Sequence, residues 1–197
     1  MIKQINFQLQ GYFMKKNHLS VLFTLIVIFL IACQKENMEG YKLYENEEYQ
    51  FTIQYPEDWT YREGFAEALN PEHGSIVVFQ SPNEGKFDLF RENVHIFAEA
   101  LPDSVADIAS YLKYSKNFLP TQFDEITFLD EGRLAIDGKI SRWIMFEYVR
   151  QLRRVSSIGY MFYMDGYGLV INSTARPEDI MKYRRTFENI STSIKFK

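Results

Sequence analysis

Two histidines are the side chains of this sequence best suited to metal binding or acid–base chemistry. His73 lies in a predicted turn beside Glu72, and His95 lies in a predicted strand three residues after Glu92. A zinc site needs three or four converging ligands, and neither histidine belongs to a spacing motif that would supply them. We therefore expect both histidines to be structural, and we assign no metal ligand.

Catalytic and cofactor motifs are equally absent from the sequence. Serines and acids are abundant enough for a Ser-His-acid triad, but no Gly-x-Ser-x-Gly elbow is present. Neither Gly-x-Gly-x-x-Gly nor a Walker pattern occurs, so no phosphate-binding loop is expected. We predict a protein that is not an enzyme, has no catalytic residue and carries no cofactor.

Charged clusters offer weaker candidates for binding. Two basic clusters could meet an anionic partner or lipid headgroups: Arg150, Arg153 and Arg154 in a predicted turn, and Lys182, Arg184 and Arg185 on the last predicted helix. An acidic run of Glu45, Glu47 and Glu48 could bind a cation weakly, although calcium loops space their acids alternately and add a bend glycine. Such charges are more often solvated, and we expect that here.

The single cysteine, Cys33, follows an apolar segment at 19–31 that is preceded by Lys15 and Lys16. About a dozen apolar residues suit a signal peptide and fall short of the roughly 20 that span a bilayer. Leu30, Ile31, Ala32 and Cys33 resemble the lipobox of bacterial lipoproteins. The resemblance implies cleavage before Cys33, a diacylglycerol thioether on its sulfur and an acyl chain, such as palmitate, on the new amino terminus.

This motif predicts three segments: a signal peptide at 1–32, a lipidated flexible tether at 33–48 and one domain at 49–197. The first thirteen residues do not resemble a signal, so Met14 is the predicted initiator. Gln34 is not the aspartate that retains lipoproteins at the inner membrane, and Glu36 is the only acid in the window that surface-export signals use. We expect a cell-envelope protein anchored at the outer membrane, on its periplasmic face or at the cell surface.

Charge and cysteine content constrain the mature protein further. Loss of Lys3, Lys15 and Lys16 with the signal peptide lowers the net charge from −4 to about −7. An acidic body lacks the basic footprint that phosphate contacts require, which argues against nucleic acid as a partner. With Cys33 acylated no thiol remains for a disulfide, so stability must come from a hydrophobic core.

Hydrophobic periodicity in the last 150 residues predicts a sheet with two helices. Period-two alternation or compact branched runs indicate strands at 49–55, 75–80, 94–97, 125–129, 133–136, 139–150, 155–164, 167–174 and 194–196. Asp137-Gly138 and Asp165-Gly166 predict hairpin turns. One helix is expected to start with Ser104 as its cap and Asp107 in a capping box, and the other to open at 176–179.

The long strands are apolar on both faces, which a sheet exposed on one side would not need. We therefore predict an α+β fold: a twisted antiparallel sheet with helices on both faces. The segment 51–59, Phe-Thr-Ile-Gln-Tyr-Pro-Glu-Asp-Trp, resembles the opening of the PsbP-like family, and the strand, helix and final Ser193-Ile194-Lys195-Phe196 resemble its end. The resemblance implies an α/β/α sandwich, shared with Mog-type import factors, whose members mostly act in binding or assembly.

Three hypotheses of function follow. The first is a non-catalytic, membrane-anchored envelope lipoprotein whose domain binds a partner protein or assists assembly. The second is a carrier of a small ligand or metal ion in a cleft between sheet and helix. Phe118, Phe123 and Phe128 are candidates for the rim of such a cleft, although core packing is the default expectation for them. The third is a hydrolase using His73 or His95.

Overall fold

The central strands bury apolar side chains on both of their faces. In the computed structural model, which describes residues 38–64, 73–86, 88 and 90–197, Ile158, Tyr160 and Phe162 of one strand belong to one hydrophobic core. Val155 and Met161 of the same strand belong to a second core on the opposite face. Alternate side chains of a strand point to opposite faces, so this sheet needs a cover on each side.

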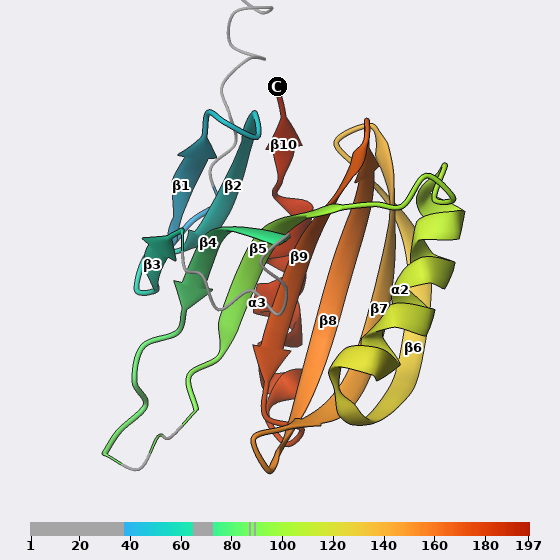
Figure 1. The fold of residues 1–197 in the computed structure, drawn as a ribbon. Coiled ribbons are helices and arrows are strands. Elements are labelled where there is room, and N and C mark those ends of the chain that lie inside the picture. The colour runs from blue at the N-terminus through green and yellow to red at the C-terminus, as the bar shows by residue number, and fades with distance from the viewer. Residues whose placement is uncertain (1–37, 65–72, 87, 89) are drawn as a thin grey trace, which may run out of the picture. The chain divides into compact units, whose positions relative to one another are not determined.

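Seven strands form that sheet in the order β3-β4-β5-β9-β8-β7-β6, with antiparallel neighbours throughout (Figure 1). A separate three-stranded sheet has the order β1-β2-β10. The described elements are β1 (Tyr41–Asn46), β2 (Phe51–Pro56), β3 (Thr60–Glu63), β4 (His73–Gln80), β5 (Asn93–Ala100), α2 (Ile108–Gln122), β6 (Asp124–Ile136), β7 (Lys139–Arg150), β8 (Arg153–Met164), β9 (Tyr167–Ala175), α3 (Ile180–Thr192) and β10 (Lys195–Phe196).

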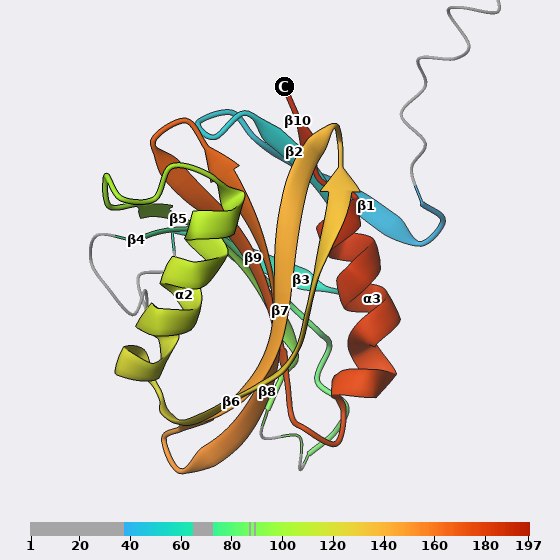
Figure 2. The same ribbon diagram turned by 90° about the vertical axis from the view of Figure 1, so that its right-hand side faces the viewer.

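The two described helices lie on opposite faces of the seven-stranded sheet (Figure 2). Helix α2 covers one face near β6, β7 and β8. Helix α3 covers the other face together with the small sheet, whose strand β2 it contacts. The predicted α+β architecture, with helices on both faces, is confirmed. Neither described helix is long and apolar enough to cross a membrane.

Strand β1 corrects the predicted boundary of the tether. The segment 33–48 was expected to be a flexible tether, but Tyr41–Asn46 pairs with β2 along its whole length. Tyr44 is buried and packs edge-on against the ring of Phe79. A single buried tyrosine among charged residues gives too little periodicity to indicate a strand. The tether prediction is therefore wrong from Tyr41 onward.

The start of α2 corrects a second prediction. Asp107, not Ser104, caps the helix, and its carboxylate accepts a hydrogen bond from the backbone N–H of Ser110 at 2.7 Å. The Ser110 hydroxyl completes the capping box by accepting from the backbone N–H of Asp107 at 3.0 Å. The predicted box was displaced by three residues because Ser104-x-x-Asp107 and Asp107-x-x-Ser110 both match its pattern.

The hairpin predictions are confirmed, and β6 proves longer than expected. Asp137 and Gly138 both have positive φ, 48° and 75°, as a two-residue type I′ turn requires. The turn at Asp165-Gly166 joins β8 to β9. The two segments predicted at 125–129 and 133–136 are one strand, interrupted by register shifts near Thr127 and Asp130.

We expect Asp107→Ala to lower the free energy of unfolding by about 1 kcal/mol, because it leaves N–H groups of the first turn of α2 without an acceptor. The matched variant Ser104→Ala removes a hydroxyl outside the capping box and should change it by less than about 0.5 kcal/mol. Chemical denaturation followed by circular dichroism measures both values. Equal losses in the two variants would contradict this assignment of the cap.

Candidate functional site

A cavity of about 220 Å³ lies between the C-terminal half of α2 and the seven-stranded sheet. Its helix wall is formed by Ser115, Phe118, Leu119 and Gln122, with Phe123 following at the C-cap. Its floor comes from β5, β7, β8 and β9. The floor and remaining wall residues are Phe90, Asn93, His95, Phe97, Glu99, Ile144, Phe146, Tyr148, Arg150, Val155, Gly159, Met161, Val170, Asn172 and Thr174.

The other end of α2 is held close to the sheet by Tyr111. This side chain is fully buried, and its hydroxyl donates a hydrogen bond to the carboxylate of Glu99 on β5. Burial and the neighbouring Glu99 raise the pKa of Tyr111 well above its ordinary value, so it stays a neutral donor. Its ring occupies the space that a side chain on Gly168 of β9 would need. The helix is thus fixed at one end, and the cavity lies beneath its other end.

Two rungs of the sheet give the cavity a polar floor. Asn93 pairs with Thr174 across β5 and β9, and His95 pairs with Asn172 in the next rung on the same face. The Asn172 amide donates to the Thr174 hydroxyl at 3.2 Å. Gly159 lies opposite Asn172 on β8 and leaves the centre of the floor without a side chain. The apolar walls therefore enclose a small band of uncharged hydrogen-bonding groups.

His95 is neutral at physiological pH. Burial and the nearby positive charge of Arg150 lower its pKa from 6.5 to about 4. Its Nε2 lies 2.9 Å from the hydroxyl of Ser75 on β4, and its ring packs against Phe97. The Ser75 contact gives the hydrolase hypothesis a serine–histidine pair. However, a histidine with a pKa of about 4 is a weak general base at neutral pH.

Arg150 at the end of β7 is exposed and also lines the cavity. Its backbone pairs with that of Arg153 on β8, but its guanidinium forms no ion pair or hydrogen bond with the described residues. Arg154, in the same predicted basic cluster, instead contacts the carboxylate of Glu125 at 2.8 Å. The structure thus separates Arg150 from Arg154: one guanidinium lies at the cavity and the other is paired outside it.

Of the three phenylalanines that were candidates for the rim of a cleft, two line the cavity. Phe118 and Phe123 line the cavity, on either side of the break at Leu119-Pro120. Phe128 does not line it, because its ring packs beside Phe146 and under the ammonium group of Lys116. Phe128 instead packs against the hydrophobic core on the α2 face of the sheet, as the default expectation of core packing predicts.

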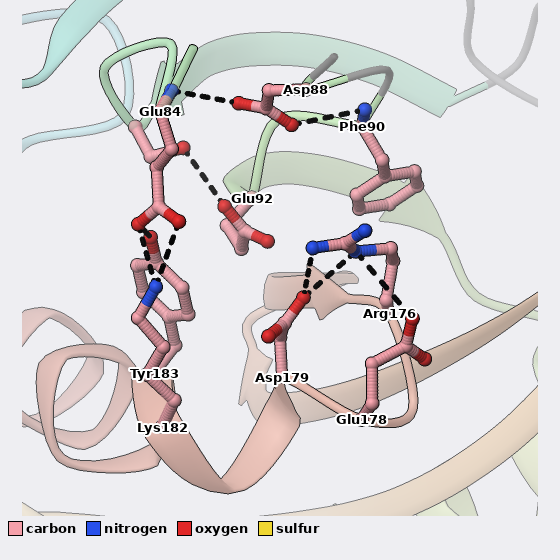
Figure 3. Close-up of polar contacts among 10 residues, drawn as sticks. Glu84, Asp88, Phe90, Glu92, Arg176, Glu178, Asp179, Lys182 and Tyr183 are labelled. Carbon is pink, nitrogen blue, oxygen red and sulfur yellow. Dashed lines mark hydrogen bonds and ion pairs between the residues drawn. The ribbon is translucent and has the colours of Figure 1, made fainter.

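The basic cluster predicted on the last helix is largely neutralised by neighbouring acids. Lys182 contacts the carboxylate of Glu84 at 2.6 Å, and the Tyr183 hydroxyl donates to the same group at 2.5 Å (Figure 3). Arg184 pairs with Glu188 one turn along α3 at 2.9 Å. The contacts of Glu84 tie the β4–β5 connection to α3. Two of the three cations of the cluster are thus paired with acids, while Arg185 is exposed.

The other sequence candidates are placed as follows. His73 lies on β4 with its backbone opposite Glu99, and its side chain is outside the described part of the structure, as is the whole of Cys33. Glu45 of the acidic run pairs with Lys197. No group of three or more metal-binding side chains occurs among the described residues. The structure therefore supplies no donor set on which to build a metal site.

A second hollow, of about 370 Å³, lies on the opposite face between α3 and the sheet. Its walls include Trp143 and Leu134 beside the Arg184–Glu188 ion pair. Polar and apolar groups line it about equally, unlike the mainly apolar cavity under α2. The aromatic walls and uncharged floor make the cavity under α2 the stronger candidate for binding a small molecule.

No protein-family model and no curated protein sequence matches the chain. Among solved structures, cyanobacterial PsbP from Synechocystis sp. PCC 6803 superposes with a TM-score of 0.57 at 12% identity, over 84% of this chain and 97% of that one. LpqN of Mycobacterium tuberculosis, described as involved in cell envelope biogenesis, superposes with a TM-score of 0.55 at 12% identity, over 80% of this chain and 90% of that one. PA94 of Pseudomonas aeruginosa, described as a putative regulator, superposes with a TM-score of 0.54 at 14% identity, over 78% of this chain and 95% of that one.

The pH dependence of stability should report the environment of His95. Its folded-state pKa lies below its unfolded value, so between pH 6.5 and about 4 the unfolded chain binds the proton first. The free energy of unfolding should therefore fall over that window as the pH decreases. His95→Gln should remove this component. Carbon-detected NMR should show the His95 ring still neutral at pH 5.5; a ring that titrates near 6.5 would contradict the assignment.

Proposed function

The domain has a PsbP-like fold, and we propose that it binds a small, mainly apolar molecule in the cavity beneath α2. The single observation that supports this most directly is the combination of aromatic walls with two uncharged polar rungs. Cavities that bind small molecules join apolar surface, which provides affinity, to a few polar groups that set orientation. Of the hypotheses drawn from the sequence, this combination favours the small-ligand carrier over protein binding.

The size of the cavity restricts its ligand. A dry cavity of about 150 Å³ in another protein accepts benzene. At about 220 Å³, this one suits a molecule with one aromatic ring and a short substituent. Phe118, Phe123 and Phe146 can pack against such a ring, and offset or edge-to-face contacts add to the burial of apolar area. Asn172 and Thr174 can then hydrogen-bond a polar substituent.

We further propose that this binding domain is anchored in the cell envelope through acylated Cys33. The sequence before Cys33 supports the anchor. The fold shared with LpqN, which is described as involved in cell envelope biogenesis, is consistent with that location. Two or three acyl chains are sufficient for stable attachment, whereas one chain binds only marginally.

Protein binding remains a second candidate because of the outer strand β6. This strand ends the seven-stranded sheet and pairs only with β7 within the described chain. Leu129 and Leu134 on it are 48% and 41% exposed. An edge strand with exposed leucines can pair with an extended segment of a partner. The register shifts near Thr127 and Asp130 enclose Leu129, so such pairing is limited to the regular part of β6 that follows them and contains Leu134.

A non-enzymatic role fits the chemistry of the cavity. The Ser75–His95 pair would need a base that accepts a proton near neutral pH, and the low pKa of His95 makes it a poor one. We therefore assign His95 and its neighbours to ligand contact and not to catalysis.

Filling the cavity should abolish binding of a small aromatic probe. Gly159→Val places a side chain at the centre of the floor, where the nearest neighbour of the new Cβ is the Asn172 Oδ1 at 3.4 Å. We expect indole to raise the melting temperature of the wild-type full-length chain in lipid nanodiscs and to leave that of Gly159→Val unchanged. The matched control is Leu134→Ser, in the hollow beside α3, which should respond as wild type does.

Two results would contradict the proposed binding site. One is the absence of any indole-dependent stabilisation of the wild-type chain. The other is an equal rise in melting temperature with indole for wild type and Gly159→Val. Loss of that rise in Leu134→Ser would place the binding site in the hollow beside α3. Circular dichroism of each variant checks that the fold is retained.

The anchor has a separate test. Cys33→Ala removes the thiol that would carry the lipid, so the protein should move from the membrane fraction to the soluble fraction after cell lysis. Cys33→Ser provides a matched variant with a nearly isosteric side chain and should behave in the same way. A protein that stays with the membrane in both variants would contradict the lipid anchor.

A further inference from the structure

The charges around the cavity are distributed unevenly along its length. At its inner end, Glu99 accepts the hydrogen bond of Tyr111 and is buried. At its middle, His95 is neutral and Asn172 is uncharged. At its mouth, the exposed guanidinium of Arg150 lines the wall and makes no ion pair within the described residues. The accessible charge of the cavity is therefore positive and lies at its opening.

The register of the sheet places neutral donors next to that charge. Arg150 ends β7, and Tyr148, two residues before it on the same face, pairs with Val155 of β8. The following rungs carry Asn93 with Thr174 and then His95 with Asn172. A group bound at the mouth can thus reach Arg150 first and the amide and hydroxyl groups of the floor next.

We infer that the ligand of this cavity is a small organic carboxylate, with its apolar body between α2 and the sheet and its carboxylate against Arg150. This inference rests on the proposed binding function and specifies the chemical class of the ligand. Guanidinium groups match the planar carboxylate by two parallel hydrogen bonds, and such charged bonds are stronger than neutral ones. The aromatic walls favour an aromatic or short aliphatic body.

A carboxylate suits these residues better than a phosphate does. Arg150 is the one cation that lines the cavity, because Arg153, opposite it on β8, does not line it. The polar floor residues Asn93, Asn172 and Thr174 are uncharged. A single guanidinium balances one negative charge, whereas a phosphate ester dianion would enter an apolar cavity with a charge left uncompensated. The positive charge of Arg150 at the opening also repels an amine. Glu99, the acid of the cavity that could bind an amine, already accepts the hydrogen bond of Tyr111.

Two ligands that share a ring and a three-carbon chain and differ in their polar end test this inference. 3-Phenylpropionate and 3-phenylpropan-1-ol have the same ring and chain and differ in the carboxylate. Isothermal titration into the wild-type full-length chain in nanodiscs, with empty nanodiscs as blank, should give a dissociation constant about tenfold lower for the acid, as a charged hydrogen bond predicts.

Arg150→Met isolates the contribution of the guanidinium, because methionine keeps much of the apolar stem of the arginine. This variant should bind the acid and the alcohol with similar affinity. The matched control, Arg154→Met, removes an arginine of the same hairpin that is paired with Glu125. It should keep the preference for the acid.

The outcomes separate this inference from the proposed function. If wild type binds the acid and the alcohol equally, and Gly159→Val binds neither, the cavity binds small apolar molecules but the carboxylate inference is overturned. A preference for the acid that survives in Arg150→Met and disappears in Arg154→Met also overturns it. If wild type and Gly159→Val bind both ligands alike, the proposed site itself is wrong.

Discussion

The arrangement of the domain depends on the burial of both faces of the central sheet. Strands β7, β8 and β9 carry apolar side chains on alternate faces, so each face must be kept from water. One face is covered by α3 together with the three-stranded sheet, and the other is covered by α2. Tyr111 holds one end of α2 against Gly168 and Glu99, and the space beneath the other end remains as the cavity.

Much of this fold could be predicted from the sequence because its signals are local and strong. Two-sided apolar strands indicated a covered sheet, and Asp137-Gly138 indicated a hairpin. The errors arose where a signal was ambiguous. Asp107 could be either the last residue of one capping box or the first of another. Strand β1 buries only Tyr44 deeply, so its charged neighbours made it resemble a tether.

The candidate site was harder to predict, because its residues come together only through sheet register. Phe118 and Phe123 were recognisable as a cluster near the end of a helix. Asn93 and His95 show the same two-residue spacing as Asn172 and Thr174, and these polar pairs on otherwise apolar strands were the available signal. That β5 pairs with β9, which are far apart in the sequence, cannot be read from local periodicity. Arg150 was likewise indistinguishable from Arg154 until the fold separated them.

A small molecule bound in the proposed site would lie in the space beneath α2. The most direct measurement is a set of intermolecular nuclear Overhauser contacts between bound indole and the full-length chain with labelled methyl groups. Indole bound beneath α2 should give contacts to the methyl groups of Met161 and Val170, which line this cavity. Contacts to Leu134 and Met145, in the hollow beside α3, would contradict it.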